Sequence, residues 1–326
     1  MKILVTGGAG FIGSNFILYL LKKHPEDSVI CVDKLTYAGN LENLDAVRDS
    51  QRFSFEKTDI CDREKIYEIF ERERPDAVVN FAAESHVDRS IENPEIFLKS
   101  NILGTAVLMD ACLKFGDVRF HQISTDEVYG ELPEDRPDLM FSEESPIRPN
   151  SPYSVSKASA DMLVLSYIRT YRLRATISRC SNNYGPFQLA EKLIPRMIAS
   201  CIRGEKLPVY GDGMNVRDWI YVEDHGSAVD LILRRGVIGE IYNVGSRCEM
   251  KNLDLVRMIA ARFKGCDTQI VFTEDRKGHD RRYAVDPSKI EKELGWRPAT
   301  KLREGLESTV NWYLDNRSWW DRPDTM

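Results

Sequence analysis

The sequence predicts an α/β fold: a Rossmann-type, doubly wound parallel sheet followed by a smaller α/β C-terminal substrate lobe. Three observations predict this class. Short apolar strands alternate with helical segments over roughly the first 180 residues. A glycine-rich turn joins the first strand to the first helix, and an acidic residue ends the second strand. Strands of this kind, covered by helices on both faces, form parallel sheets.

The first unit is a strand, a turn and a helix. Residues 2–6 are apolar, Gly7, Gly10 and Gly13 follow, and an apolar-periodic helix runs through Leu21. Glycines at these positions allow a tight turn, close approach of the backbone to a pyrophosphate, and close packing of helix on strand. The turn therefore predicts a dinucleotide site, and a plain glycine-rich turn is the alternative.

The second strand, 29–33, argues against that alternative. It ends in Asp33, about twenty residues after Gly13, where an acidic side chain can bind the hydroxyl groups of a ribose. A carboxylate at this position also repels a ribose phosphate. The sequence therefore favours NAD over NADP.

Four more strands are expected before the regular alternation ends, and they lie at 53–57, 77–81, 119–125 and 175–179. After Arg179 the pattern changes: we expect a loop at 182–186, a helix near 192–203 and a turn at 210–213. Residues 1–180 are thus predicted to form the NAD-binding domain with the catalytic residues, and residues 181–326 a lobe that closes over the substrate. The last strand of the sheet can come from either side of this boundary.

A helix that starts near residue 151 carries the first candidate catalytic pair. Ser151 can cap this helix, and Pro152 suits its first position. Tyr153 and Lys157 are four residues apart, so they share one face and can meet the same ligand. We expect the ammonium to favour the phenolate and to lower the pKa of Tyr153, which makes the tyrosine a base for a hydroxyl group.

Two adjacent acids form the second candidate pair. Asp126 and Glu127 follow the strand that ends at Thr125. Adjacent positions within a strand point to opposite faces, so both acids are expected just past the strand end, where the chain turns. Two close carboxyl groups resist being charged together, which raises the pKa of one of them. The sequence leaves open which one keeps the proton, and a pair that merely caps the next segment is the alternative.

The composition fits one enzyme with a large core. The chain has 326 residues, of which 42% are hydrophobic and 29% charged, and its formal net charge of −6 gives no sign of a nucleic-acid or membrane surface. We expect a cytoplasmic protein, because Met1 leads directly into the first strand and no segment reaches the roughly 18 apolar residues of a membrane span. Seven cysteines without a Cys-x-x-Cys pair are expected to be reduced thiols, and five histidines without metal-pair spacing predict no metal site.

Several longer motifs add a resemblance to these features. They are Asp33-Lys-Leu-Thr-Tyr-Ala-Gly-Asn40, Ala82-Ala-Glu-Ser-His-Val-Asp-Arg-Ser90, Ser124-Thr-Asp-Glu-Val-Tyr-Gly130, Arg179-Cys-Ser-Asn-Asn-Tyr-Gly-Pro186, Glu191-Lys-Leu-Ile-Pro195, Arg217-Asp-Trp219 and Gly278-His-Asp-Arg-Arg-Tyr283. With them the chain resembles the dTDP-glucose 4,6-dehydratase family of the extended short-chain dehydrogenase/reductase superfamily. The resemblance runs from residue 2 to about residue 313, and its specificity rests on separate motifs in the family order.

The resemblance implies a lyase that dehydrates dTDP-glucose through a transient ketone at C4. Tyr153 takes the C4 hydroxyl proton while NAD accepts the C4 hydride, Lys157 holds the ribose, and Thr125 binds the C4 oxygen. Glu127 then removes the acidified C5 proton, Asp126 protonates the departing C6 hydroxyl, and the hydride returns to C6. The implied product is dTDP-4-keto-6-deoxyglucose, an intermediate of deoxysugar biosynthesis such as the rhamnose pathway.

The resemblance also implies the contacts with cofactor and substrate. Besides Tyr153 and Lys157, the residues carried over to the NAD site are Gly7, Gly10, Phe11, Ile12, Gly13, Asp33, Lys34, Leu35, Thr36, Asp59, Ile60, Phe81, Ala82, Ala83, Ser85, Ser100 and Asn183. Those carried over to the nucleotide-sugar site are Ser85, His86, Thr125, Asn182, Glu191, Lys192, Leu193, Pro208, Tyr210, Arg217, Asn252, His279, Asp280, Arg281 and Tyr283.

For two of these residues an alternative role remains open. The guanidinium fork of Arg217 can grip a diphosphate, or it can form a surface salt bridge with Asp218 or Asp224. His86 can face the sugar or serve the structure alone.

The chain departs from the family at two places. Ser100 stands where the family usually has threonine, which keeps a hydroxyl. Leu189-Ala190 replaces an aromatic-proline pair before Glu191, which puts the local loop geometry in doubt, not the reaction.

Other functions on the same scaffold remain as alternatives. A 4,6-dehydratase of another nucleotide hexose, such as UDP-glucose, differs in the nucleobase, and one methyl group is worth roughly 1 kcal/mol of burial. A nucleotide-sugar 4-epimerase also uses tyrosine and lysine but carries small residues in place of Asp126 and Glu127. A non-catalytic NAD sensor tends to lose the tyrosine or the lysine. The resemblance also implies a homodimer, joined through a four-helix interface by the helix at 94–115 and the Tyr153 helix.

Overall fold

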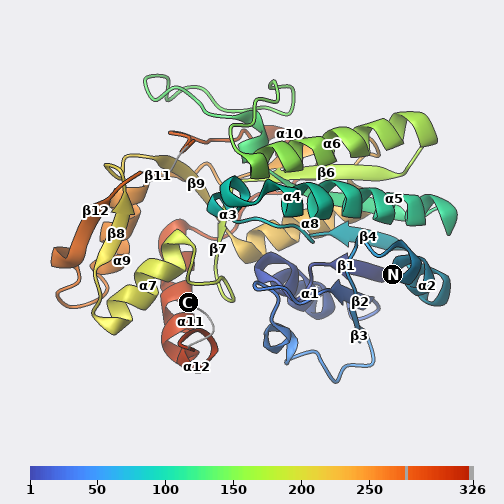
Figure 1. The fold of residues 1–326 in the computed structure, drawn as a ribbon, viewed down its shortest axis with the longest axis horizontal. Coiled ribbons are helices and arrows are strands. Elements are labelled where there is room, and N and C mark those ends of the chain that lie inside the picture. The colour runs from blue at the N-terminus through green and yellow to red at the C-terminus, as the bar shows by residue number, and fades with distance from the viewer. Residues whose placement is uncertain (276–277, 323–326) are drawn as a thin grey trace.

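A seven-stranded parallel sheet forms the centre of the molecule. The structure, a computed structural model, describes residues 1–275 and 278–322. The strand order is β10-β6-β5-β4-β1-β2-β3, and every described pair in this sheet is parallel (Figure 1). Its strands are β1 (Lys2–Thr6), β2 (Ser28–Asp33), β3 (Phe53–Lys57), β4 (Ala77–Asn80), β5 (Arg119–Thr125), β6 (Ala175–Cys180) and β10 (Ile241–Val244). The predicted fold class is confirmed.

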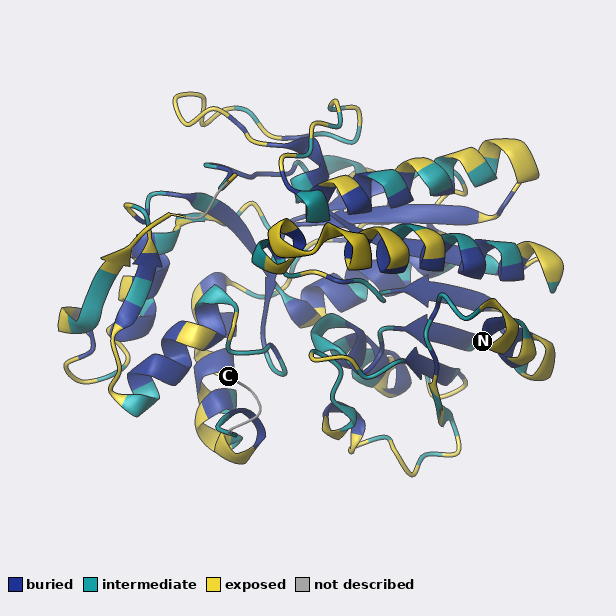
Figure 2. Cartoon of the chain, in the orientation of Figure 1, coloured by how far each residue is buried: buried dark blue, intermediate teal, exposed yellow. Residues whose placement is uncertain are grey.

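Helices cover both faces of this sheet. On one face α1 (Phe11–Lys23) packs against α8 (Val222–Arg235), and on the other α5 (Thr105–Lys114) packs against α2 (Arg63–Glu73) and α6 (Pro152–Tyr171). Side chains alternate along β1 and so pack into two separate hydrophobic cores. Ile3 and Val5 lie on the face covered by α1, and Leu4 lies on the face covered by α5. Figure 2 accordingly shows the strands of the sheet as buried over most of their length, except the edge strand β3, which is partly exposed.

The strand order places a ligand crevice at a definite point. From β1 the chain winds outward through β2 and β3, and it then returns to the other side of β1 with β4 and β5. Open α/β sheets bind ligands outside the carboxyl ends of the strands where this reversal occurs. The carboxyl ends of β1, β4 and β5 are therefore the expected place of the site.

Most of the predicted elements agree with the structure to within one residue. The helix expected at 94–115 is continuous, but its centre is π-helical: α4 (Pro94–Phe97) leads into η2 (Leu98–Gly104) and then α5. The prediction of a loop at 182–186 is wrong in part. Asn182–Tyr184 forms strand β7, because it pairs in parallel with β9 (Val216–Tyr221) of the second lobe.

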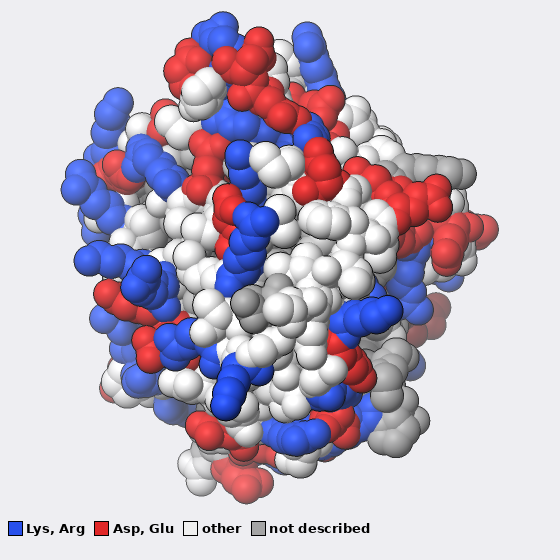
Figure 3. All heavy atoms as spheres, turned by 90° about the vertical axis from the view of Figure 1, so that its left-hand side faces the viewer, with Lys and Arg blue, Asp and Glu red and all other residues white. Residues whose placement is uncertain are grey.

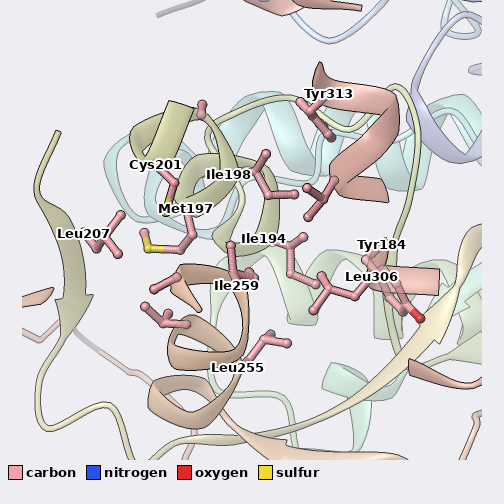
Figure 4. Close-up of a cluster of buried hydrophobic side chains, with 14 of the residues drawn as sticks. Tyr184, Ile194, Met197, Ile198, Cys201, Leu207, Leu255, Ile259, Leu306 and Tyr313 are labelled. Carbon is pink, nitrogen blue, oxygen red and sulfur yellow. The ribbon is translucent and has the colours of Figure 1, made fainter. Parts of the chain in front are cut away.

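The C-terminal lobe has two small sheets and a core of its own. The sheets are β11-β9-β7 and β12-β8. Figure 4 shows its apolar side chains meeting between helices and strands, among them Met197, Ile198, Ile259 and Tyr313. The elements outside the large sheet and its helices are α3 (Val87–Glu92), α7 (Leu193–Arg203), β8 (Leu207–Tyr210), β11 (Glu249–Lys251), α9 (Asn252–Ala260), β12 (Ile270–Thr273), α10 (Ser288–Leu294), α11 (Leu302–Asp315) and α12 (Arg317–Trp320), with 3-10 turns η1 (Leu41–Leu44), η3 (Asp126–Tyr129) and η4 (Asp267–Gln269).

The large lobe contains residues from both sides of position 180. Strand β10 and helix α8 lie beyond residue 180 but belong to the large sheet and its cover. The C-terminal helices return to the first lobe, where Trp319 Nε1 donates to Asn43 Oδ1 at 2.8 Å. The division at residue 180 stays a prediction, and the sheet takes its last strand from beyond it, which the sequence had left open.

The N-terminus of α6 gives a stability prediction. Ser151 Oγ accepts from Ser154 N at 3.1 Å, so it caps the helix as predicted. We expect Ser151→Ala to lower the free energy of unfolding by about 1 kcal/mol, because an orphan amide loses its acceptor. Urea denaturation at fixed NAD concentration measures the change. Ser166→Ala, an exposed position on the same helix, is the control and should change it by less than about 0.5 kcal/mol; an equal loss in both variants would contradict the capping role.

Candidate active site

The glycine turn after β1 is too crowded for side chains. Gly7 has φ +64°, and a Cβ there would lie 2.6 Å from Ala82 N. A Cβ at Gly13 would lie 2.3 Å from the Gly7 carbonyl oxygen. Both positions therefore require glycine, the first for its backbone conformation and both for space. The turn leads directly into the first turn of α1, where the backbone N–H groups have no acceptor within the helix.

Asp33 is fixed at the end of β2, beside this turn. Its Oδ2 accepts from Ala9 N at 3.0 Å and its Oδ1 from Leu35 N at 2.8 Å. Burial raises the pKa of the carboxyl group above its ordinary value, and the two amide donors oppose that shift. Each oxygen keeps a lone pair, so the group can still accept from a ligand hydroxyl.

The remaining predicted cofactor residues gather at the same edge of the sheet. Phe11 and Ile12 open α1, and Lys34, Leu35 and Thr36 follow β2. In the same way Asp59 and Ile60 follow β3, Phe81, Ala82, Ala83 and Ser85 follow β4, Ser100 lies in η2, and Asn183 lies in β7 just after β6. The parallel sheet brings these sequence-distant segments together because all its strands end on one side.

A residue that the sequence analysis missed holds one of these segments. Asn101 accepts from Glu84 N at 2.9 Å, and its amide donates to the Glu84 carbonyl at 3.0 Å and to Ser156 Oγ at 2.8 Å. It thus ties the loop after β4 to α6. The available signal was an amide side chain in an otherwise apolar helical stretch, next to Ser100.

The acidic pair lies just past the end of β5, as predicted. Asp126 and Glu127 open the 3-10 turn η3. Thr125 Oγ donates to Asp126 Oδ1 at 3.2 Å and accepts from Glu127 N at 3.3 Å, while Ser154 Oγ donates to Glu127 Oε2 at 3.2 Å. Strand β5, η3 and helix α6 therefore orient the two carboxyl groups together.

Asp126 lies in surroundings that raise the pKa of its carboxyl group. It is buried, and its Oδ2 has no hydrogen-bond partner within the described part of the chain. Burial raises its pKa well above the ordinary value, and the nearby Glu127 and Asp218 carboxylates raise it further against the opposing effect of Arg217. The surroundings of Asp126 thus disfavour its charged form.

Tyr153 and Lys157 lie on one face of α6, but one expectation about them is wrong. Lys157 Nζ donates to the carbonyl oxygen of Ile123 at 2.6 Å. Burial, followed by the charges of Glu127, Cys180 and Asp126, raises the pKa of Tyr153 well above its ordinary value. The predicted lowering does not occur, because burial and the nearby acidic groups raise the pKa instead. A hydrogen bond with Thr125 acts in the opposite direction.

Arg217 faces the acidic pair from the C-terminal lobe. It is buried, which excludes the alternative of a surface salt bridge. Its guanidinium donates to the carbonyl oxygens of Val216 at 2.8 Å and Asp280 at 2.8 Å, and it lies 4.4 Å from the centroid of the Tyr283 ring. Tyr283 in turn donates its hydroxyl to the Asp280 carboxylate. Strand β9 and the 278–283 segment therefore form one wall of the site.

Further predicted substrate residues lie on elements of the C-terminal lobe. Arg281 pairs with Asp212 at 2.7 Å and with Glu134, and His279 Nδ1 lies 2.6 Å from Asp275 Oδ1. The predicted residues Pro208 and Tyr210 belong to β8, Leu193 opens α7, Asn182 lies in β7 and Asn252 opens α9. The amide oxygens of Asn182 and Asn252 are buried without a hydrogen-bond partner in the described chain, as expected of groups that meet a ligand or water.

The segment at 191–192 bridges the two lobes. Tyr37 OH donates to Glu191 Oε1 at 3.4 Å, His86 Nε2 lies 3.6 Å from Glu191 Oε2, and Lys192 Nζ donates to the Ser85 carbonyl at 3.2 Å. His86 also caps α3 through its Nδ1, which accepts from a backbone amide at 3.4 Å. The structural role considered for His86 is therefore present alongside its place at the site.

The outer face of the C-terminal lobe carries charges of both signs. Figure 3 shows Lys and Arg interspersed with Asp and Glu on this face, around an uncharged area near its centre. A face of this kind does not have the continuous basic stripe that nucleic-acid binding requires.

Comparisons with known proteins show the family to which the chain belongs. The sequence model of a family described as GDP-mannose 4,6 dehydratase matches residues 4–309. The dTDP-glucose 4,6-dehydratase of Neisseria meningitidis serogroup B is 48% identical over 339 residues, which cover 98% of this chain and 95% of that protein. The dTDP-glucose 4,6-dehydratase 1 of Escherichia coli K12 is 48% identical over 345 residues, with 98% and 95% covered.

Solved structures show the same fold. The Bacillus anthracis dTDP-glucose 4,6-dehydratase in complex with NAD has a TM-score of 0.91 at 44% identity and covers 98% of this chain and 99% of its own. A UDP-glucose 4-epimerase of Thermotoga maritima, with UDP-glucose, has a TM-score of 0.89 at 33% identity, with 97% and 100% covered. The chain therefore belongs to the GDP-mannose 4,6 dehydratase family and, within it, to the dTDP-glucose 4,6-dehydratases of the extended short-chain dehydrogenase/reductase fold.

Proposed function

We propose that this protein converts dTDP-glucose to dTDP-4-keto-6-deoxyglucose with the help of bound NAD. The observation that carries the proposal is the meeting of two pairs at the carboxyl end of β5: the Asp126–Glu127 carboxyl groups and the Tyr153–Lys157 pair. An epimerase on this fold needs the second pair but not the first. The relatives that share 48% identity over nearly the whole chain carry the same activity in their names.

The residues at the glycine turn fit NAD. The space at Gly7 and Gly13 is closed to any side chain, which keeps the backbone free for close approach of a pyrophosphate. Asp33 is held by two amides with lone pairs to spare for ribose hydroxyls, and its charge opposes a 2′-phosphate. When bound, NAD supplies the acceptor and later the donor of one hydride. Related dehydratases solved with NAD support this assignment.

The protein's own side chains divide the proton transfers. Tyr153 takes the proton of the C4 hydroxyl as a phenolate, which the Thr125 hydrogen bond and the Lys157 ammonium on the same face of α6 favour against the burial that raises its pKa. Thr125 also holds the C4 oxygen, and Lys157 orients the cofactor ribose. The resulting ketone acidifies the C5 proton, which Glu127 removes. Asp126, whose pKa is raised by burial and by its acidic neighbours, gives its proton to the departing C6 hydroxyl.

The substrate's nucleotide lies against the C-terminal lobe in this proposal. Arg217 and Arg281 supply positive charge near the diphosphate, and Asn182 and Asn252 supply the buried amide oxygens without partners described above. Glu191 and Lys192 close the site from the interlobe segment. The remaining substrate contacts are those implied by the resemblance.

An isotope experiment tests the reaction. We expect the enzyme to remove one water from dTDP-glucose, a loss of about 18 Da, and to move deuterium from C4 to C6 of the same sugar, because one hydride leaves and returns. Mass spectrometry of the product measures both.

A panel of dTDP-, UDP-, CDP- and GDP-hexoses run in parallel tests the nucleobase preference, with the highest kcat/KM expected for dTDP-glucose. A product of unchanged mass with an inverted configuration at C4 would establish the epimerase alternative. If no sugar reduces the bound nicotinamide, the sensor alternative holds.

Substitutions of Asp126 and Glu127 should impair different steps of the reaction. We expect Asp126→Asn, which keeps the site neutral, to slow water loss by about 10²–10⁴-fold while the C5 proton still exchanges with solvent. Glu127→Gln should abolish that exchange as well, because no base remains for C5. Deuterium incorporation at C5 in heavy water, followed by NMR, separates the variants. Exchange lost in Asp126→Asn and kept in Glu127→Gln would reverse the assignment.

We also infer a homodimer formed through α6 and the helical stretch of α4, η2 and α5. Large apolar side chains stand exposed on this face, among them Leu98, Leu103, Val155 and Met162. Pro94–Lys114 is long and apolar enough to cross a membrane by length and composition alone, yet 56% of its most apolar window is buried inside the protein. A second copy explains the apolar outer face better than lipid, since the inner face packs on the sheet. We accordingly infer a cytoplasmic location.

A substitution that introduces a charge on this face tests the dimer. Leu103 is 60% exposed in the single chain, and we expect Leu103→Asp to convert the dimer to a monomer because two copies would bury the new charges together. Sedimentation velocity measures the mass. Val237→Asp, at an apolar position 55% exposed on another surface, is the control and should remain dimeric. A wild-type monomer, or a Leu103→Asp dimer, would contradict the interface.

A further inference from the structure

We propose that Tyr37 is a positioning residue of the cofactor site: together with Arg89 it holds Glu191 of the C-terminal lobe against the first lobe, and this contact slows the release of NAD between turnovers. We call the contacts of Tyr37, Arg89 and His86 with Glu191 and Lys192 the interlobe latch. The inference rests on the proposed function, because an enzyme that takes a hydride from each sugar and gives it back needs the same NAD for every turnover.

The loop that carries Tyr37 is tied to the dinucleotide turn. Asn40 N donates to the Ala9 carbonyl oxygen at 3.0 Å, and Asp33, at the other end of the loop, accepts from Ala9 N at 3.0 Å. Both ends of the loop are thus anchored at one residue of the glycine turn. Because the loop also carries Thr36, a predicted cofactor contact, a displacement of Tyr37 displaces the backbone next to the cofactor.

Tyr37 reaches from this loop to the C-terminal lobe. Its hydroxyl donates to Glu191 Oε1 at 3.4 Å, and the guanidinium carbon of Arg89 lies 4.0 Å from the centroid of its ring. A cation this close to the ring face fixes the orientation of the ring. Burial raises the pKa of Tyr37 to about 12, so the hydroxyl keeps its proton and remains a donor to the carboxylate.

The other oxygen of the Glu191 carboxylate faces His86. His86 Nδ1 accepts from Arg89 N at 3.4 Å, which places the proton of the neutral ring on Nε2. This nitrogen lies 3.6 Å from Glu191 Oε2. Burial lowers the pKa of His86 and so favours the neutral ring. Both oxygens of Glu191 therefore face proton-bearing groups of the first lobe.

Lys192 adds a contact at a second segment of the first lobe. Its Nζ donates to the Ser85 carbonyl oxygen at 3.2 Å and lies 4.0 Å from Glu191 Oε1. Ser85 follows β4, whereas Tyr37 follows β2. Two neighbouring residues of the C-terminal lobe thus contact both segments that carry predicted cofactor residues, and we infer that bound NAD leaves more readily once these contacts are broken.

The experiment measures how fast NAD leaves the holoenzyme. Tyr37→Phe removes only the hydroxyl group, and Arg89→Met removes the cation. We expect NAD to dissociate about 3–10-fold faster from each variant, because each loses one hydrogen bond or one cation–π contact of the interlobe latch. Exchange of bound tritium-labelled NAD against an excess of unlabelled NAD, followed by rapid filtration, measures the rate.

Tyr67→Phe is the matched control. The Tyr67 hydroxyl accepts from Arg63 Nη1 at 2.7 Å, and the Arg63 guanidinium carbon lies 5.6 Å from the centroid of its ring. The two residues make the same kinds of contact as Tyr37, but both belong to α2 and do not join the lobes. The rate of NAD release should stay within about twofold of the wild type in this variant.

A double-mutant cycle separates the latch from a general loss of stability. Tyr37→Phe and Glu191→Met break the same contact, so together they should speed NAD release by clearly less than the product of their separate effects. Two independent losses of stability would multiply instead. The melting temperature of each variant without NAD, measured in parallel, reports any change in stability that does not involve the cofactor.

Unchanged NAD release in Tyr37→Phe or in Arg89→Met would overturn the proposal, and so would effects that multiply in the double variant. Failure of the proposed function looks different. In that case the wild type makes no 4-keto product from dTDP-glucose, while the exchange of labelled NAD, which needs no sugar, still decides whether the interlobe latch retains the cofactor.

Discussion

The hydrogen bond from Lys157 Nζ to the Ile123 carbonyl joins α6 to the carboxyl end of β5, and the rest of the site depends on this junction. It places the Tyr153 side of the helix beside the 3-10 turn that carries the acids. Ser154, one residue after Tyr153, reaches Glu127 across the same junction. Helix and strand thus act as one unit, and the reacting groups come from rigid elements, not from flexible loops.

Much of this arrangement could be predicted from the sequence, because it depends on local order. The glycine turn and Asp33 sit in one strand–turn–helix unit, Tyr153 and Lys157 are four residues apart on one helix, and Asp126 directly follows a strand. Helical and strand periodicity fix such relations without knowledge of the tertiary fold. The cap of α6 at Ser151 followed from the same kind of local rule.

The features that were missed depend on burial and on contacts between distant segments. The pKa of Tyr153 rises because the folded chain removes water from it and places carboxylates around it, which no spacing in the sequence reveals. Asn182–Tyr184 becomes a strand because β9, more than thirty residues later, offers it a partner. Asn101 and Asp161 are single polar residues whose partners lie on other elements.

The return of the C-terminal part of the chain to the first lobe has a consequence for biosynthesis. Strand β10 completes the large sheet on one edge, and Trp319 anchors to Asn43 beside the dinucleotide turn. The contact beside the dinucleotide turn therefore forms only after residue 319 has left the ribosome. The end of β10 follows the end of β6 by 64 residues, so at roughly 5–20 residues per second the outer edge of β6 waits about 3–13 seconds for its partner, an interval in which that edge is open to chaperones.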